Sequence, residues 1–467
     1  MDAGIALQTA LEQRSAERDP VHRVKRYMDG HHDESYMPKS YEQEFRKLVQ
    51  RAIGNWLPLV VDTLSQTLYV EGYRRAEDPE NGDAWRYWTV NGLDSRQNLV
   101  HRSALTYGTA YVSVLPGDRG PAIRVHSPLT MTVVQEDPDA EWPDYAIRRV
   151  RTGKTPAGDR FTVWELIDAD GVWLWQVPDG AEGPAEYDLL AVEDHGQDIC
   201  PVVVFRNRWP DDPDTGITQL GEIEQLIPIQ DRLNDTTVGL LVAQQYSAFK
   251  QKWATGIHIP RGQDGRPVES FEAAANRVWM TESKDVTFGE FSETTLSGYL
   301  ASQESAIKHM SAIAQVPPHY LLGGLVNISA EALAAAEAGL TRKANERKTL
   351  FGEAWGRVFR LAAAVAGDIA SAEDPDARVI WRDTEARSLS ASADALGKLA
   401  TSLQIPVESL WEMIPGVSPF QLREWREARA QNMAGSAAEI AAALISGDDA
   451  RMPVGESGGA EETPEAV

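Results

Sequence analysis

The sequence predicts an α+β fold that is predominantly helical, with helical and antiparallel β regions segregated along the chain. Three observations predict it. Long segments on both sides of residues 109–205 repeat apolar residues at helical spacing. Residues 109–205 break instead into short apolar runs separated by Gly, Pro and Asp, which is typical of antiparallel strands. Residues 330–366 keep the helical repeat over a length of roughly 55 Å if they form one helix.

The first part of the chain is expected to begin with a polar leader and then to form helices. Ser40–Leu68 has helical apolar spacing, but Gly54 and Pro58 are expected to bend or divide this helix. Tyr69–Tyr73 is predicted to be a short strand and Gly82–Tyr107 a further helix. The strands predicted after it are Tyr111–Leu115, Ala122–Val125, Met131–Gln135, Ala146–Val150, Phe161–Ile167, Val172–Val177 and Val202–Phe205.

The clearest hairpin is the segment WELIDADGVWLW, in which Asp170-Gly171 separates two alternating runs and suits a tight turn. Its tryptophans, Trp164, Trp173 and Trp175, have two interpretations. They could form a platform on which a carbohydrate stacks, or one wall of a hydrophobic core. Tryptophans on a hairpin more often belong to a core, and this is the interpretation that we favour.

The middle of the chain predicts two helices around a small module. Pro210–Gly216 is expected to be a linker, and Ile217–Lys250 is helical, with Pro228 either kinking it or starting a new helix. Thr255–Glu290 is a mixed module, with strand-like IHIP and RVWMT around the turn-rich RGQDGRP. A second helix is expected from Glu293 to about Gln315.

The long helix is predicted to begin at Ala330, because the hydroxyl of Ser329 suits an N-cap and strong helix formers follow it. One face should be buried and the other charged. The apolar residues that define the buried face are Leu333, Leu340, Ala344, Phe351, Ala354, Val358, Leu361 and Val365. The charged residues between them are Arg342, Lys343, Glu346, Arg347 and Lys348.

Short helices and an acidic tail are expected at the end of the chain. The predicted helices are Ser388–Leu403, Val407–Ile414, Pro419–Asn432 and Ala437–Ile445. Residues 447–467 lack apolar periodicity and are rich in Gly, Asp and Glu, so we expect this tail to be disordered.

Composition limits the class of protein. The 467 residues carry a formal net charge of −25, with a pI near 4.8, which argues against tight, sequence-reading DNA binding but suits a surface past which DNA slides. We expect a soluble, untargeted protein without a membrane span, since long apolar runs and a basic, apolar leader are missing. The single Cys200 excludes an intrachain disulfide and a thiolate metal cluster, and is interpreted as an inert core thiol.

Motifs for catalysis are not matched. Gly153-Lys154-Thr155 resembles the end of a phosphate-binding loop, but that motif needs a glycine at the position of Arg148. The chain also has no GxSxG elbow for a serine nucleophile, and carboxylates are too plentiful to pair two of them by choice. We therefore predict no catalytic residue, no cofactor and no enzymatic activity.

Two clusters of metal-ligating residue types are interpreted as solvated segments. His31, His32, Asp33 and Glu34 lie in a polar loop without a partner set at metal spacing. The aspartates of the linker 210–216 lack the glycine and the distal glutamate of a calcium loop. We predict no metal site.

Three segments resemble the portal proteins of tailed bacteriophages, and in particular those of phages that infect actinobacteria. They are YMDGHH at residues 27–32, NWLPLVVDTLSQTLYVEGYR at 55–74, and VPPHYLLGGLVNISAEALAAAEAGLTRKANERKTLFGEAW at 316–355. The resemblance implies a ring of subunits, commonly twelve, at one capsid vertex, through which double-stranded DNA is packaged and later ejected. A separate terminase that docks on the ring would hydrolyse ATP, which agrees with the missing phosphate loop.

The resemblance also implies a division into parts, a head-completion adaptor and terminase as partners of the clip, contacts with major capsid and scaffold proteins, and a location in the virion after assembly in the host cytoplasm. The implied parts are a wing of helices and antiparallel sheet (1–215), stem helix 1 (216–250), a clip (251–292), stem helix 2 (293–316), a tunnel loop (317–329), the long helix and wing return (330–387), a helical crown (388–446) and the tail (447–467).

Within these parts, the tunnel-loop residues are Tyr320, Gly323, Gly324 and Asn327. Asn327 has two interpretations, because its side chain could donate hydrogen bonds to DNA or could cap a helix or form a turn.

Twelve copies at −25 give a ring of about −300, so any cation that meets DNA phosphates would be isolated. The resemblance places the helices that carry Lys308, Lys343 and Arg347 near the channel, which makes these residues candidates for DNA contacts. The alternative interpretation is that they form salt bridges along their helices or between neighbouring subunits.

Two other functions stay open from the sequence. The chain could be another ring-forming adaptor of the phage head and neck, although its length and its clip-like module argue against this. It could also be a carbohydrate-active hydrolase that uses the tryptophan-rich sheet.

Overall fold

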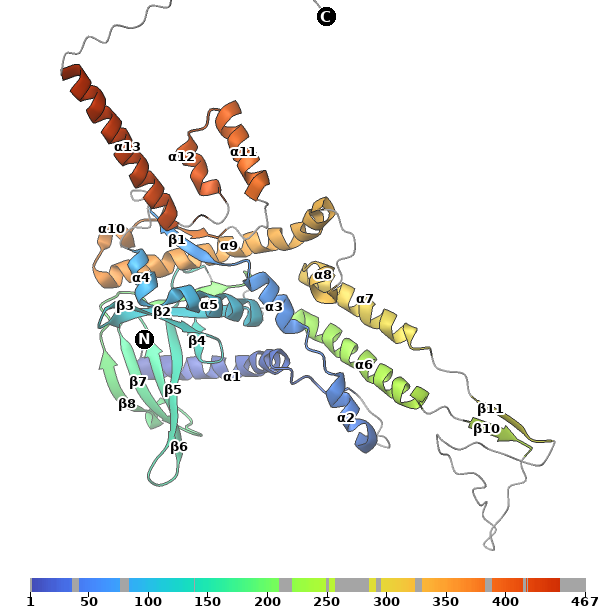
Figure 1. Ribbon diagram of the computed structural model, residues 1–467. Coiled ribbons are helices and arrows are strands. Elements are labelled where there is room, and N and C mark those ends of the chain that lie inside the picture. Colours follow the sequence, from blue (N-terminus) through green and yellow to red (C-terminus); the bar gives the residue numbers. More distant parts are fainter. Residues whose placement is uncertain are drawn as a thin grey trace, which may run out of the picture. The chain divides into compact units, whose positions relative to one another are not determined.

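The computed structural model describes residues 2–35, 42–75, 84–137, 139–209, 221–248, 252–256, 285–290, 295–323, 330–382, 389–414, 417 and 419–445. The chain divides into two compact units, Met1–Arg382 and Asp383–Val467. The first unit mixes helices with antiparallel sheets and the second is helical, which confirms the predicted α+β class with a helical majority (Figure 1).

The first unit holds all the strands of the described chain. Its helices are α1 (Ala3–Met28), α2 (Glu42–Ala52), α3 (Leu57–Ser65), α4 (Trp85–Val90), α5 (Leu93–Tyr107), α6 (Ile227–Ala248), α7 (Ser297–Ala314), α8 (Pro318–Leu322), α9 (Ala330–Ala366) and α10 (Ile369–Ala372). Its strands are β1 (Val70–Arg74), β2 (Thr109–Gly117), β3 (Gly120–His126), β4 (Met131–Val134), β5 (Tyr145–Lys154), β6 (Arg160–Ile167), β7 (Val172–Pro178), β8 (Asp188–Glu193), β9 (Val202–Arg206), β10 (Lys252–Thr255), β11 (Thr287–Glu290) and β12 (Arg378–Trp381).

Two sheets pack against each other in this unit. One has the order β3-β2-β9 and the other the order β4-β5-β6-β7-β8, with all neighbours antiparallel. Strand β2 is buried on both faces: Val112 and Val114 belong to the large core with α5 and α9, while Tyr111 and Leu115 face the second sheet. Because side chains alternate along a strand, β2 connects the two cores.

The segment expected to be a polar leader is helix α1, so that expectation is wrong. Asp2 caps it by accepting from the backbone N–H of Gly4 at 2.9 Å. Only a narrow stripe of small and apolar residues, including Leu7 and Ala10, is buried against the five-stranded sheet. The rest of the helix is polar, which concealed it in the sequence.

The tryptophan-rich hairpin lies against this helix, and the core interpretation is confirmed. Trp164 is buried with α1 residues, and the Arg14 guanidinium lies 5.3 Å from the centre of its ring. Trp173 and Trp175 are half-buried beside it. The turn spans Asp168–Gly171, so its central residues are Ala169 and Asp170 rather than Asp170 and Gly171. The Asp168 N–H donates to the Gly171 carbonyl at 3.1 Å, and the Asp168 carboxylate accepts from the Gly171 N–H at 2.9 Å.

Other element boundaries mostly follow the predictions. Ser40–Leu68 divides into α2 and α3, and Gly82–Tyr107 divides at Gly92, whose φ of 62° is left-handed. Strands β8, β10, β11 and β12 were not predicted. β8 is exposed on both faces and so shows no alternation, and β12 is a short strand that pairs with β1.

Helix α9 begins at Ala330, as predicted, and runs for 37 residues to Ala366, after which Gly367 adopts a left-handed φ of 79°. The predicted apolar face is buried from Leu340 to Leu361. The prediction that all intervening charges are exposed is wrong, because Lys343 and Arg347 are buried.

Helices α6 and α7 lie side by side and antiparallel (Figure 1). Gln303 Nε2 donates to Thr237 Oγ1 at 2.8 Å, and nearer the other end Arg232 Nη2 lies 3.2 Å from His309 Nδ1. Pro228 lies in the first turn of α6, so it starts a helix, as one of the two alternatives predicted. β10 and β11 form an antiparallel pair between the two helices in the chain. The linker 210–216, IHIP and RVWMT lie outside the described residues.

The second unit contains α11 (Leu389–Ser402), α12 (Val407–Leu410) and α13 (Pro419–Ile445). The two helices predicted at 419–432 and 437–445 are one helix, because a single Gly costs only about 1 kcal/mol relative to Ala within a helix. The tail 447–467 lies outside the described residues. Among the described helices, none combines the length and apolarity that a membrane crossing requires.

The large core depends on α9 aromatics, so Phe351→Ala should destabilise the protein by about 3–5 kcal/mol. Phe351 is fully buried and stacks on His101 with ring centres 5.4 Å apart. Leu99→Ala is the control, because Leu99 is 60% exposed, and it should change stability by no more than about 0.5 kcal/mol. Urea unfolding measures both; equal losses would contradict this account of the core.

Candidate functional site

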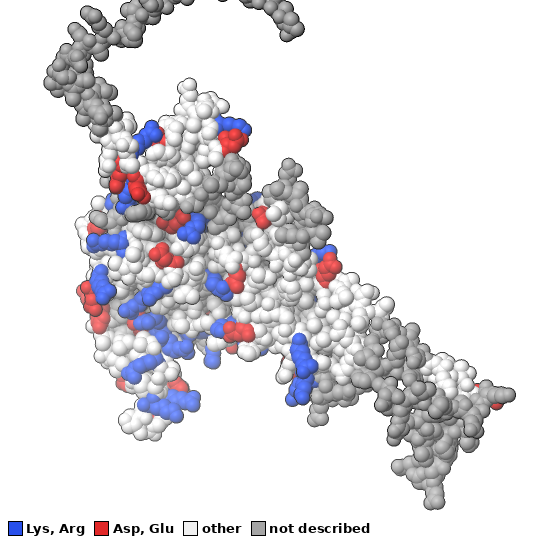
Figure 2. All heavy atoms as spheres, in the orientation of Figure 1, with Lys and Arg blue, Asp and Glu red and all other residues white. Residues whose placement is uncertain are grey.

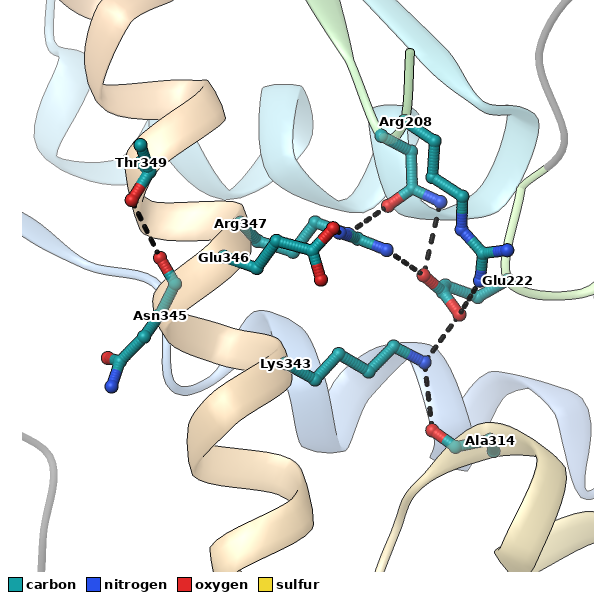
Figure 3. A network of polar contacts seen from close by, with 9 residues as sticks. Arg208, Glu222, Ala314, Lys343, Asn345, Glu346, Arg347 and Thr349 are labelled. Atoms are coloured by element: carbon teal, nitrogen blue, oxygen red, sulfur yellow. Dashed lines mark hydrogen bonds and ion pairs between the residues drawn. The ribbon is translucent and has the colours of Figure 1, made fainter. Parts of the chain in front are cut away.

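A buried ionic junction joins α7 and the segment before α6 to the long helix α9 (Figure 3). We use "junction" for five groups: Glu222 before α6, the side chain of Asn207 after β9, the backbone carbonyl of Ala314 at the end of α7, and Lys343 and Arg347 on α9. Three segments thus meet at the Glu222 carboxylate, and the end of α7 joins them through Lys343.

The backbone places Glu222 there through a close approach to the end of α5. A Cβ on Gly221 would lie 2.0 Å from the Thr106 carbonyl oxygen, so only glycine fits. The Glu222 N–H donates to the Leu105 carbonyl at 2.7 Å, and the Asn207 N–H donates to the Gly108 carbonyl at 2.8 Å. The end of α5 therefore fixes both polar residues.

The carboxylate oxygens of Glu222 are shared among several donors. Lys343 Nζ lies 2.5 Å from Oε2 and also donates to the Ala314 carbonyl at 2.8 Å. Arg347 Nη2 donates to Oε1 at 3.2 Å, and its Nε donates to Asn207 Oδ1 at 2.6 Å. Asn207 Nδ2 in turn donates to Oε1 at 3.1 Å. Together these bonds tie α9 to the segment before α6, to the segment after β9 and to the end of α7.

The junction is almost completely shielded from water. Glu222 is 1% exposed, Lys343 5% and Arg347 2%. Burial would raise the pKa of the Glu222 carboxyl, but Lys343 and then Arg347 outweigh it, so this pKa lies below its usual value. Burial lowers the pKa of Lys343, and Glu222 opposes this only in part. Removing charges from water costs several kcal/mol per ion, which is offset only while every member keeps its partner.

Lys343 and Arg347 were candidates for DNA contacts in a channel, with salt bridges as the alternative, and their burial argues against the DNA contact. Both charged groups are buried within the chain and bind Glu222. The alternative of salt bridges along the helix holds only for Arg347, whose Nη1 lies 2.9 Å from Glu346. The sequence spacing could have indicated that these two residues are buried. Lys343 and Arg347 fall three positions after Leu340 and Ala344, which places them on the apolar face of α9.

Lys308 remains a candidate for a DNA contact. It is exposed on α7, where its Nζ lies 2.7 Å from Glu304 Oε1 one turn earlier. This ion pair along the helix matches the alternative interpretation, and the channel contact stays a prediction.

The predicted tunnel loop is partly helical, because Pro318 starts the short helix α8. Tyr320 lies on this helix, 44% exposed, and its hydroxyl donates to Glu337 Oε1 at 3.2 Å. Burial, and then the nearby Glu337 carboxylate, raise the pKa of Tyr320. Gly323 ends α8 with a left-handed φ of 68°. Gly324, Asn327 and the predicted cap Ser329 lie outside the described residues.

A second buried polar network holds α6 against α1, and the sequence interpretation missed it. His32, expected in a solvated loop, is 6% exposed and stacks on Tyr27 with ring centres 4.8 Å apart. Asn234 Nδ2 on α6 lies 2.9 Å from His32 Nδ1, and the Tyr27 hydroxyl donates to Asp231 at 2.8 Å. Among the described residues, no group of three or more metal-ligating side chains could hold an ion.

The segment before α3 contacts the same helix. Gln230 Nε2 donates to the Gly54 carbonyl at 2.6 Å, and its Oε1 accepts from the Trp56 N–H at 3.1 Å. Asn55 Nδ2 donates to the Tyr27 carbonyl at 2.9 Å. The two N-terminal segments that resemble portals, 27–32 and 55–74, therefore both help to fix α6.

Glu222→Gln should destabilise the protein by about 3–5 kcal/mol, because it removes the carboxylate that pairs with buried Lys343 and leaves buried Arg347 with only the exposed Glu346. The matched control is Glu346→Gln, which removes an exposed carboxylate beside the same arginine and should cost no more than about 1 kcal/mol. Denaturant unfolding of both variants checks this. A Glu222→Gln loss as small as that of the control would refute the role of the junction.

The comparison with known proteins agrees with this architecture. The family model described as "Phage portal protein, SPP1 Gp6-like" matches residues 7–434. The portal protein of Mycobacterium phage D29 is 27% identical over 363 residues, covering 73% of this chain and 71% of that protein. The portal protein of Mycobacterium phage L5 is 27% identical over 371 residues, with the same coverage.

Two solved structures are similar at 13% identity, each with a TM-score of 0.46. One is the virion of a native gene transfer agent particle, covering 84% of this chain and 98% of the matched chain. The other is the neck of an empty particle of this kind, covering 82% and 95%. Because the family model spans residues 7–434 of 467, this chain belongs to the phage portal protein family, SPP1 Gp6-like.

Proposed function

We propose that the chain assembles into a ring at one capsid vertex and that double-stranded DNA passes through the ring during packaging and ejection. The observation that carries this proposal is the family match over residues 7–434. The antiparallel helices α6 and α7, which the junction ties to α9, support it, because a channel needs rigid walls.

Each part of the chain has a proposed role within this ring. α6 and α7 form the stem, and residues 251–292 form the clip, on which the large terminase and later a head-completion adaptor dock. The segment 317–329 meets the DNA, with α9 behind it. The second unit, which begins at Asp383, forms most of the crown. Major capsid and scaffold proteins contact the ring during assembly in the host cytoplasm.

Electrostatics supports weak contact with DNA. At −25 per chain, a ring of about twelve copies carries roughly −300, which repels the duplex and keeps contacts brief. Burial of Lys343 and Arg347 strengthens this argument, because it removes two cations from the surface that DNA could meet. The ring would be a conduit without enzymatic activity, and ATP hydrolysis would belong to the terminase.

The other candidate functions are less well supported. The hydrolase interpretation used the tryptophan-rich sheet as a binding platform, but Trp164 is buried under α1. A head–neck adaptor would also form a ring, but the family model that matches residues 7–434 is that of a portal protein.

Ring assembly is tested by cryo-electron microscopy of the purified full-length chain. We expect closed rings of about twelve copies with a central channel, because a rotational interface between identical chains closes on itself. Particles that remain monomers at every salt concentration would contradict the proposed function.

A DNA contact at Lys308 is tested by Lys308→Ala in a packaging assay. We expect intact rings but fewer DNA-filled heads, because each ring loses a set of phosphate contacts. Lys398→Ala is the matched control, since Lys398 is exposed and pairs with Asp394 one turn earlier, as Lys308 does with Glu304. If both variants package DNA equally well, Lys308 makes no DNA contact that matters for packaging, and its role is limited to the ion pair with Glu304.

A further inference from the structure

The five-stranded sheet has an outer strand, β8, that is exposed along its whole length. It pairs with β7 on one side and is the last strand of the sheet order. Its large apolar residues Leu189, Leu190 and Val192 are 47%, 46% and 48% exposed. The middle of the strand has no Lys, no Pro and no inward-pointing charge, which are three of the usual protections of an edge strand against pairing with another chain. A fourth protection, a β-bulge, is present at Leu190, where the pairing with β7 shifts by one residue.

The opposite side of the same sheet has a second open edge. β4 pairs with β5 only as far as Arg148, so the remainder of β5 has a partner strand on the β6 side alone within the described chain. This remainder, residues 149–154, includes Val150, which is 42% exposed. It is about as long as β8. The Arg149 N–H donates to the Thr130 carbonyl at 3.1 Å, and the pairing with β6 has a bulge at Val150, so the backbone groups available to another strand lie beyond Arg149.

The two edges carry opposite charges. Arg149 and Lys154 lie at the two ends of the open part of β5, and Asp188 and Glu193 lie at the two ends of β8, all of them exposed. Among the ion pairs between described residues, none includes any of these four side chains. Figure 2 shows basic side chains over the region of this sheet, reaching toward the tip of the β5–β6 hairpin, on a chain whose net charge is strongly negative.

Strand direction selects one pairing. Successive neighbours from β5 to β8 are antiparallel, so β8 runs opposite to β5. A second copy placed beside the first by a small rotation keeps its strand directions, so its β5 would run antiparallel to this β8. In that orientation Lys154 lies toward Asp188 and Arg149 toward Glu193, and both charge pairs are favourable.

The pairing requires a stagger along the strands. Through successive partners, Asp188 is level with Gln176, Val163 and then Arg151 in its own sheet. Bringing Asp188 to Lys154 of the next copy is therefore a shift of about three residues, or roughly 10 Å. Strands that are tilted relative to a central axis produce such a stagger, and the shift moves β8 past the end of β4.

We propose that β8 of one copy pairs, antiparallel, with residues 149–154 of the next copy, so that the five-stranded sheet continues from subunit to subunit. The contact is heterologous, because one edge meets a different edge, and repeated rotation by it closes a ring. This inference rests on the proposed function as a ring. In the ring, each of the two open edges of a subunit is paired with a neighbouring copy of the same chain.

Paired cysteines test the contact directly. Cys200 is the only native cysteine, and it is 1% exposed. Cross-links between subunits can therefore be attributed to the engineered cysteines. In full-length protein, Lys154→Cys with Asp188→Cys, and separately Arg149→Cys with Glu193→Cys, should give an oxidised ladder of multimers on denaturing gels. The crossed pair, Arg149→Cys with Asp188→Cys, is the control and should give none, because positions 149 and 154 are roughly 16 Å apart along the strand.

Charge reversal gives an independent readout. Arg149→Glu with Lys154→Glu should raise the concentration needed for ring assembly about tenfold, as should Asp188→Lys with Glu193→Lys. Combining the four changes should restore assembly, which an effect on folding alone would not do. Arg119→Glu with Arg124→Glu reverses two exposed cations on the neighbouring β2–β3 hairpin and should leave assembly unchanged.

The outcomes separate this inference from the proposed function. Rings that form in wild type, but show neither a ladder from the matched pairs nor rescue by the fourfold variant, overturn the edge contact and leave the portal function standing. Dimers that cross-link through Lys154→Cys alone also overturn it, because they indicate a symmetric contact. If the wild-type chain forms no ring at all, the inference and the proposed function both fail.

Discussion

The arrangement of the first unit depends on one buried carboxylate. Glu222 is neutralised by two cations from α9, and it stands at the point where the chain leaves the sheet region and enters α6. Buried ions tolerate little displacement, because each loses several kcal/mol of hydration that only close partners offset. The junction therefore fixes the angle and register at which α6, α7 and α9 meet, while apolar contacts supply most of the stabilisation.

A fixed junction suits a part that transmits force. A second network, centred on His32 and Gln230, ties α6 to α1 and to the segment before α3, so the same helix is anchored from two sides. In a ring through which DNA is driven, helices that slid against each other would dissipate the motion. Polar networks with defined partners resist sliding better than apolar surfaces, which accept several registers.

The sheet region serves a different purpose in this interpretation. Its interior is complete, with β2 buried on both faces and α1 covering the tryptophan-rich side. Its two edges are open and oppositely charged. A chain can thus have a strongly negative total charge, which favours passage of DNA, and still attract its own copy through locally complementary charges, because screening limits such interactions to about 10 Å.

The sequence by itself determined the α+β class, most helices and strands, the start of α9 at Ala330 and the portal family, because local periodicity, caps and motif wording are properties of consecutive residues. It did not reveal α1, whose buried stripe is narrow, or β8, which is exposed on both faces. Only the tertiary structure decided that Lys343, Arg347 and His32 are buried. Whether a charged or polar side chain faces water or a buried partner depends on residues more than a hundred positions away, such as Glu222 and Asn234, and no local pattern specifies that meeting.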